Sequence, residues 1–197
     1  MKTDKLSPEQ SLGLITQVIT QARNKFEENG FIYMFWGILI AIASIGQFIL
    51  LKNEYYNIHW YPYLLMPIGS IYSYFYFSKR KSRNKQNQIS KIVTYTWIFL
   101  SLNMMALGFI LASILKENLT PIILILLSIG TIISGITMKS RLLFFSGILI
   151  NLSAFLCFRV EWTYHPLLMG IVSIVAILIP GALLMAQHKK RENVQKP

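Results

Sequence analysis

Six long stretches of this chain contain no Asp, Glu, Lys or Arg. A helix that crosses the hydrocarbon core of a bilayer needs about 20 mainly apolar residues, and each stretch comes near that length. Lys139 and Arg141 separate the fourth stretch from the fifth, and we expect a tight turn there because charges are costly inside lipid. The pattern predicts an all-α polytopic membrane protein with six transmembrane helices, at residues 31–51, 61–77, 92–115, 121–138, 142–158 and 166–187.

The composition excludes a water-soluble globular domain. Hydrophobic residues make up 54% of the chain and charged residues 14%, whereas soluble domains carry about 25% charged residues. The single cysteine, Cys157, cannot form a disulfide within the chain and is expected to be a small packing residue. In the second predicted span, Pro67 is expected to kink the helix because it removes an internal hydrogen bond.

The basic residues predict which side of the membrane each loop faces. With the N-terminus in the cytoplasm, three of the 19 Lys and Arg residues lie outside, namely Lys52, Lys116 and Arg159. Each has an acidic neighbour in its loop, so the net charge of +11 lies on the cytoplasmic side, as membrane insertion favours. We therefore expect both termini in the cytoplasm and anionic lipid headgroups as partners of the basic loops. Nucleic acid is not expected as a partner, because no soluble domain presents these charges to it.

An N-terminal cytoplasmic segment, residues 1–30, precedes the first span and contains a predicted amphipathic helix. Its apolar side chains recur at helical spacing on one face, which includes Leu12, Ile15, Ile19 and Phe26. This face fits the inner membrane surface, the cytoplasmic end of the helix bundle or a protein partner. A basic cytoplasmic tail, residues 188–197, follows the transmembrane domain of residues 31–187.

The spans show signs of an internal repeat. Residues 61–71, YPYLLMPIGSI, match residues 164–174, YHPLLMGIVSI, at seven of eleven positions. An offset of 61 residues also pairs Trp36 with Trp97 and Gly69 with Gly130. We expect three αα-hairpins in the same orientation, forming a threefold repeat about the membrane normal. The alternative is a chance recurrence of apolar residues and glycine.

The predicted spans contain little that could perform chemistry. Their main polar side chains are Gln47, Asn103 and Asn151, which fit hydrogen bonds between helices or contacts to a substrate. No zinc-protease, nucleophile-elbow or phosphate-loop motif occurs, so we expect neither an enzyme nor a bound cofactor.

The predicted outer loops are rich in aromatic residues around His59 and His165. Tyrosine and tryptophan are enriched where a membrane meets water, so these residues fit an aromatic belt. The alternative is that the repeat brings His59 and His165 together as two ligands for a metal ion or haem.

Three segments carry a family resemblance. They are Glu28, Asn29, Gly30 and Phe31 leading to Phe35, Trp36 and Gly37; TPIILILLSIGTIISG at 120–135; and LLMGIVSIVAILIPGALL at 167–184. The chain resembles an uncharacterised family of small six-span bacterial inner-membrane proteins. The resemblance implies six spans, a bacterial inner-membrane location and a cytoplasmic N-terminus, and it carries over no active residues.

Two functions follow as hypotheses. The first is a non-enzymatic membrane protein that acts through its cytoplasmic surface, on lipid or on a protein partner. The second is a facilitated carrier or channel for a neutral or apolar solute, which the repeat and the polar residues at depth favour.

Overall fold

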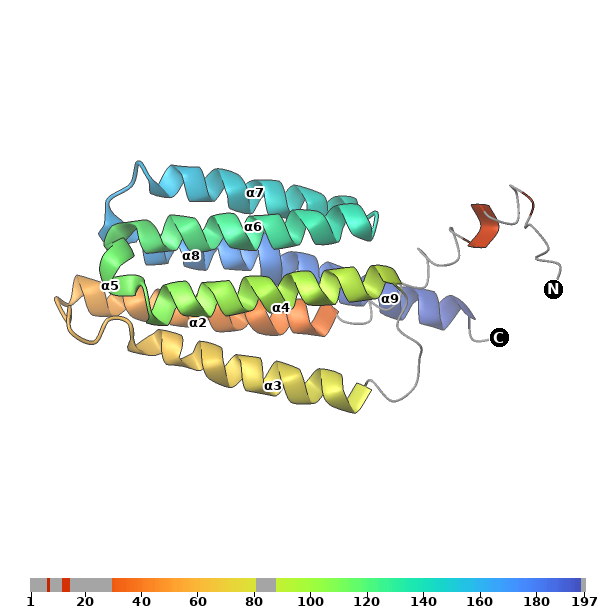
Figure 1. The fold of residues 1–197 in the computed structure, drawn as a ribbon, viewed down its shortest axis with the longest axis horizontal. Coiled ribbons are helices and arrows are strands. Elements are labelled where there is room, and N and C mark those ends of the chain that lie inside the picture. Colours follow the sequence, from red (N-terminus) through yellow and green to blue (C-terminus); the bar gives the residue numbers. More distant parts are fainter. Residues whose placement is uncertain (1–6, 8–11, 15–29, 81–87, 196–197) are drawn as a thin grey trace, which may run out of the picture.

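The computed structural model describes residues 7, 12–14, 30–80 and 88–195. Within these residues the regular structure is entirely helical, and no strand occurs. The long helices lie side by side in one elongated bundle (Figure 1). The all-α prediction is therefore confirmed.

The elements follow one another in a simple order. They are α2 (Gly30–Lys52), η1 (Tyr61–Leu64), α3 (Leu65–Arg80), α4 (Gln88–Phe109), α5 (Ala112–Leu115), η2 (Lys116–Asn118), α6 (Leu119–Thr137), α7 (Arg141–Cys157), η3 (Trp162–Tyr164), α8 (His165–Ser173), the π-helical turn η4 (Ile174–Leu178) and α9 (Ile179–Gln195).

Four helical segments of the described chain are long and apolar enough to cross a bilayer. They are Gly30–Lys52, Lys91–Phe109, Ala112–Thr137 and Trp162–Gln187. The remaining two long helices are shorter, since α3 has 16 residues and α7 has 17. The four apolar segments are those of a membrane protein. That all six long helices cross the bilayer stays a prediction.

The third predicted span ends earlier than expected. The sequence predicts that it reaches residue 115, but α4 ends at Phe109 and the chain turns through Ile110 and Leu111. Both turn residues donate their backbone N–H to the Ala106 carbonyl, which closes the end of α4. Hydropathy could not locate this break, because the residues on both sides of it are apolar. The short helix α5 leads instead into α6.

The prolines affect the helices differently. Pro67 is the third residue of α3, and η1 runs directly into this helix, since the Leu65 N–H bonds the Pro62 carbonyl. The kink expected at Pro67 stays a prediction. Pro180 cannot donate to the residue four positions earlier, and the preceding turn, η4, widens to π-helical geometry before α9 continues.

The chain makes a tight turn between α6 and α7, as predicted from the two charged residues Lys139 and Arg141. Lys139 adopts a left-handed backbone with φ of 50°. Its N–H bonds the Ile136 carbonyl at 3.1 Å, and the Ser140 N–H bonds the Gly135 carbonyl at 2.9 Å. These two bonds form a Schellman motif, which ends α6 and reverses the chain into α7.

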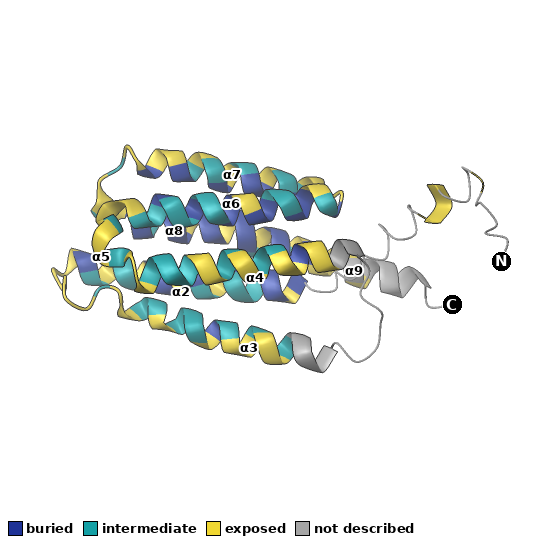
Figure 2. Cartoon of the chain, viewed as in Figure 1, coloured by how far each residue is buried: buried dark blue, intermediate teal, exposed yellow. Residues whose placement is uncertain are grey.

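The apolar core lies among α2, α6, α7, α8, η4 and α9. Its members include Tyr33, Ile40, Leu124, Leu127, Leu143, Ile150, Ala154, Cys157, Met169, Val172, Ala176, Ile177 and Leu184. Figure 2 shows that the described parts of α3, at the lower edge of the view, and of α4, which lies in front of α2, are mostly exposed or intermediate. Their exposed side chains are largely apolar, for example Ile71 on α3 and Phe99 on α4, as expected of surfaces that face lipid.

Glycines allow two pairs of helices to approach closely. A Cβ on Gly135 would lie 2.5 Å from the backbone nitrogen of Phe144, so α6 and α7 touch backbone to backbone. In the same way, a Cβ on Gly181 would lie 2.8 Å from the backbone nitrogen of Met34, where α9 meets α2. Small residues at such contacts are typical of helix packing in membranes.

Candidate functional site

The loops after α2, around α5 and after α7 lie at the same end of the bundle (Figure 1). This loop end is the end that the charge pattern predicts to face outside. The loops after α2 and α7 meet there through aromatic rings, with the centroids of Tyr56 and Trp162 6.4 Å apart. This end of the fold thus joins segments that are about a hundred residues apart in the chain.

Lys52 holds the two loops together. Its Nζ donates a hydrogen bond of 2.9 Å to the hydroxyl of Tyr164 and lies 4.3 Å from the centre of the same ring. The centre of the Phe48 ring lies 5.8 Å from the same Nζ. An ammonium above aromatic rings is stabilised by their electron-rich faces, so Lys52 fixes the end of α2 against η3.

His59 folds back onto α2. Its Nδ1 accepts a hydrogen bond of 2.9 Å from Nε2 of Gln47, and its ring lies against Trp162 with centroids 6.3 Å apart. Partial burial lowers the pKa of His59 below its ordinary value of 6.5, since burial disfavours the charged ring. Gln47 therefore serves a contact within the protein.

His165 has a different environment. It begins α8, is 5% exposed, and its Nε2 lies 3.0 Å from the carbonyl oxygen of Val160. The two histidines thus have separate partners in the protein, and pairing them as metal or haem ligands stays a prediction. Within the described part of the chain, no group of three or more His, Cys, Asp or Glu residues is placed to hold a metal ion.

A second polar chain ties η1 to the core. The Ser44 and Tyr63 hydroxyls lie 3.2 Å apart, and the Tyr63 hydroxyl donates to Sδ of Met169 at 3.8 Å. The sequence did not single out these residues, because a serine, a tyrosine and a methionine in apolar segments carry no distinctive spacing.

The polar residues predicted at depth behave in two ways. Asn151 on α7 donates to Oγ of Ser128 on α6 at 3.0 Å, which is the predicted bond between helices. Asn103 instead donates to the Phe99 carbonyl of its own helix at 2.8 Å and is exposed. Of the three, Asn151 and Gln47 therefore join separate segments.

Two tryptophan–serine bonds occur at the same separation in the chain. Nε1 of Trp36 donates to Oγ of Ser73 at 3.1 Å, and Nε1 of Trp97 donates to Oγ of Ser134 at 3.0 Å. Each pair is separated by 37 residues. The first bond joins α2 to α3 and the second joins α4 to α6. The 61-residue offset relates these residues in the sequence, but it did not reveal that they bond.

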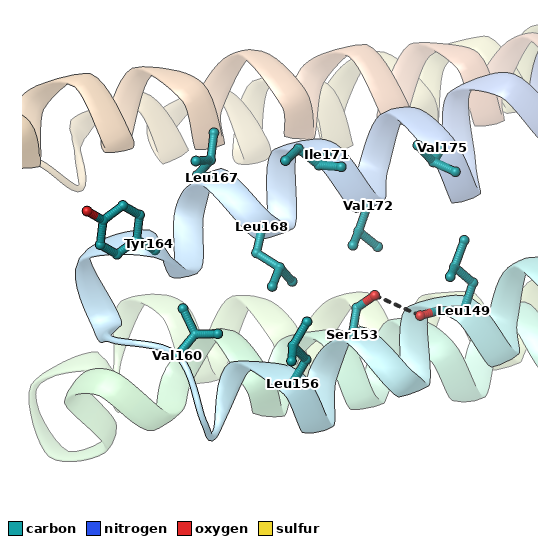
Figure 3. Close-up of a pocket in the computed structure, with 10 residues that line it drawn as sticks. All are labelled: Leu149, Ser153, Leu156, Val160, Tyr164, Leu167, Leu168, Ile171, Val172 and Val175. Carbon is teal, nitrogen blue, oxygen red and sulfur yellow. Dashed lines mark hydrogen bonds between the residues drawn. The ribbon is translucent and has the colours of Figure 1, made fainter.

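A pocket of about 480 Å³ lies between α7 and α8 (Figure 3). Its walls are aliphatic apart from Ser153 and Tyr164, and its residues are Leu149, Ser153, Leu156, Val160, Tyr164, Leu167, Leu168, Ile171, Val172 and Val175. Tyr164 stands at the loop end of the pocket, where Lys52 bonds its hydroxyl. The sequence offered no signal for this pocket, because its lining is indistinguishable from other apolar helix surface.

The predicted N-terminal interaction face falls mostly outside the described residues. Ile15, Ile19 and Phe26 lie outside them. Residues 12–14 are helical, and Leu12 is 67% exposed.

The geometry defines the class of this molecule as an α-helical bundle in which at least four described helices suit a bilayer. Comparison with protein-family models, with curated proteins and with solved structures finds no match for this chain.

Proposed function

We propose that this chain is a non-enzymatic, multi-pass protein of the bacterial inner membrane that acts by binding lipid or protein partners. Both termini lie in the cytoplasm in this proposal, and the loop end faces outside, as the distribution of basic residues favours. The observation that carries the proposal is the apolar core, which runs through α2, α6, α7, α8 and α9.

The polar side chains buried in the bundle support a structural rather than a chemical role. Seven of them bond to backbone carbonyls or to neighbouring side chains; these are Ser44, Ser128, Thr131, Ser134, Ser146, His165 and Ser173. A buried polar group that already has a partner costs energy to redirect toward a substrate. These groups therefore favour packing over transport or catalysis.

In this proposal all six long helices cross the membrane. Helix α7, with 17 residues, is about 25 Å long, and η1 with α3 forms a continuous segment of similar reach. Small mismatches to a hydrocarbon core of about 30 Å are met by local thinning of the bilayer.

A repeat of helical pairs is part of the proposal. The matching Trp36–Ser73 and Trp97–Ser134 bonds support it for the first two pairs. So do Gly69 and Gly130, because a Cβ on either would meet the leucine and tryptophan that the same offset relates. The third pair departs from the pattern, since Ser146 and Ala176 occupy the corresponding positions.

The second candidate is a facilitated carrier for a neutral or apolar solute. The pocket between α7 and α8 is the observation that favours it, since its volume is within the range of small-molecule sites. It is lined by aliphatic groups and so would suit an apolar solute better than a polar one.

A flux experiment separates the two candidates. The purified full chain is reconstituted into liposomes, and the uptake of glycerol, urea and an apolar fluorescent probe is compared with that of empty liposomes. Our proposal predicts equal uptake in both. Uptake above the empty liposomes that falls in Asn151→Leu, and not in the exposed Asn103→Leu control, would replace it with the carrier.

A second measurement tests the interaction itself. A photo-crosslinking residue at Leu12 in native membranes is expected to form adducts with lipid or with a protein, above the level at an exposed loop position such as Glu54. Adduct levels no higher than at the control would remove the N-terminal helix from the proposal.

A further inference from the structure

Helix α4 has two apolar faces, and only one of them is covered by the described part of the chain. On the inner face, Val93 and Trp97 pack against Met138. On the opposite side, four large side chains are 55% to 65% exposed, namely Ile92, Tyr95, Phe99 and Leu102. They follow one another at intervals of three, four and three residues, which is the spacing at which two helices pack side by side. We call this side the outer face of α4.

Apolar side chains on such a face fit lipid, but the outer face also carries the exposed amide of Asn103. Asn103 lies six residues before the end of α4 at Phe109, about 9 Å along the helix axis. No charged residue occurs between Lys91 and Lys116. In a bilayer crossed by the segment Lys91–Phe109, the short side chain of Asn103 therefore lies in hydrocarbon and does not reach water.

The amide of Asn103 has hydrogen-bonding capacity left over. An asparagine side chain has two N–H bonds and a carbonyl oxygen. One N–H of Asn103 donates to the Phe99 carbonyl of the same helix at 2.8 Å. Among the described residues, its second N–H and its Oδ1 have no partner. A polar group without a partner in hydrocarbon costs free energy, so a neighbour that supplies one acceptor and one donor at this depth stabilises the outer face.

We propose that a second copy of this chain packs on the outer face of α4, with the two Asn103 amides bonded to each other across a two-fold axis along the membrane normal. An amide with one free donor and one free acceptor is complementary to itself, because each can donate to the oxygen of the other. Copies inserted in the same orientation place Asn103 at the same depth, as a two-fold interface requires. A lipid tail offers neither a donor nor an acceptor.

The residues around Asn103 suit contact between two copies. Phe99 and Leu102 lie within one helical turn of Asn103 and supply the van der Waals contact on which helix packing in membranes rests. Ala106 follows three residues later on the same side, and a small side chain there lets the two helices approach. The inference deepens the proposed function, because it rests on α4 crossing the membrane and names a second copy as one protein partner.

The dimer is tested by energy transfer between full chains labelled at their C-termini with a donor or an acceptor dye. The chains are reconstituted in liposomes of phosphatidylethanolamine and phosphatidylglycerol and diluted with lipid. We expect the wild type to show transfer that fits a dimer. In Asn103→Leu, the apparent dissociation constant is expected to rise by about 3- to 20-fold, as for a hydrogen bond between helices in a membrane.

Two variants serve as controls for this measurement. Asn103→Gln keeps an amide on the outer face and is expected to keep most of the dimer. Phe155→Ala changes an aromatic side chain on α7 that is 57% exposed, and it is expected to leave the dissociation constant unchanged. Equal dissociation constants for the wild type and Asn103→Leu would overturn the role of the amide.

A crosslink tests the geometry with Asn103 in place. In a Cys157→Ala background, Phe99→Cys is expected to form a disulfide-linked dimer when native membranes are oxidised with copper phenanthroline, because a two-fold axis brings the same residue of both copies together. Phe155→Cys on α7 is the matched control. Crosslinking at Phe99→Cys no greater than at this control would overturn the proposed interface.

A wild type that stays monomeric in liposomes would overturn the second copy and leave lipid as the cover of the outer face. That result would not remove the proposed function, which also admits lipid and other proteins as partners. Failure of the proposed function would instead appear as solute flux.

Discussion

The side chains that join the helices of this bundle are few and specific. Trp36 and Trp97 each place an indole N–H on a serine of another long helix. Ser134 in turn donates its own proton to the Gly130 carbonyl, so its oxygen is directed to receive the indole. In an apolar setting these bonds orient one helix on another, although each adds little free energy.

A double-mutant cycle measures the second of these bonds. We expect Trp97→Phe and Ser134→Ala to show a coupling free energy of about 0.6 kcal/mol and no more than about 1.7 kcal/mol in reversible unfolding from detergent. The cycle of Trp36→Phe with Ser73→Ala is expected to give a similar value. Trp97→Phe with Ser153→Ala is the control and should show no coupling, because Ser153 bonds within its own helix. Zero coupling in both tryptophan cycles would contradict the role given to these bonds.

His59 predicts a pH dependence with a defined sign. Its pKa lies below 6.5 in the folded protein because the ring is partly buried, so the unfolded chain binds the proton more tightly. The free energy of unfolding should therefore be constant above pH 6.5, fall as the pH drops through that value, and level off below the folded pKa. Protonation also removes the acceptor for Gln47.

The titration of His59 is measured by NMR of the ring, and its stability effect by unfolding at several pH values. We expect the His59→Gln variant to lose this part of the pH dependence. A His59 pKa at or above 6.5 would contradict the assignment.

The helices themselves pack most closely where glycine removes the side chain. Gly135 and Gly147 bring α6 and α7 together, while Gly37 brings α2 against η4 and Gly181 brings α9 against α2. No residue with a Cβ fits at Gly135, since the atom it would meet is backbone that cannot move without shifting α7. The distance between the helices of each pair is therefore limited by one or two glycine positions.

Gly135→Ala is predicted to destabilise the protein. Its Cβ would lie 2.5 Å from the Phe144 nitrogen, and overpacking of this kind costs about 1–3 kcal/mol. Gly108→Ala is the matched control, because nothing lies within 4 Å of the place its methyl group would take and alanine favours a helix by up to about 1 kcal/mol. The measurement is the free energy of unfolding of both variants, and a Gly135→Ala variant as stable as Gly108→Ala would contradict the close contact.

The molecule as a whole places three loops at one end of the bundle (Figure 1). With an even number of crossings the two chain ends lie on the same side, and the loops that carry Lys52, Lys116 and Arg159 lie on the other. This arrangement gives the proposed topology a direct test.

Single cysteines in a Cys157→Ala background report the side of each loop. We expect Glu54→Cys, Glu117→Cys and Glu161→Cys to react with a membrane-impermeant maleimide on intact cells. Lys139→Cys, in the turn between α6 and α7, is expected to react only after the membrane is opened. Labelling of Lys139→Cys on intact cells, or protection of any of the other three, would contradict six crossings with cytoplasmic termini.

The sequence by itself determined the helical class, the long apolar segments and the tight turn at Lys139. These follow from local rules, because an apolar segment of about 20 residues must satisfy its backbone within a helix and charges must leave lipid. The end of α4 at Phe109 could not be predicted from local hydropathy, because the residues on both sides of it are apolar.

Only the tertiary structure decided what the side chains do. It gave His59 and His165 different hydrogen-bond partners, it turned Asn103 back onto its own helix, and it set Lys52 on Tyr164. It also formed the pocket between α7 and α8. Lys52 and Tyr164 are 112 residues apart, and a contact over that separation depends on how whole helices pack, which no local pattern of residues records.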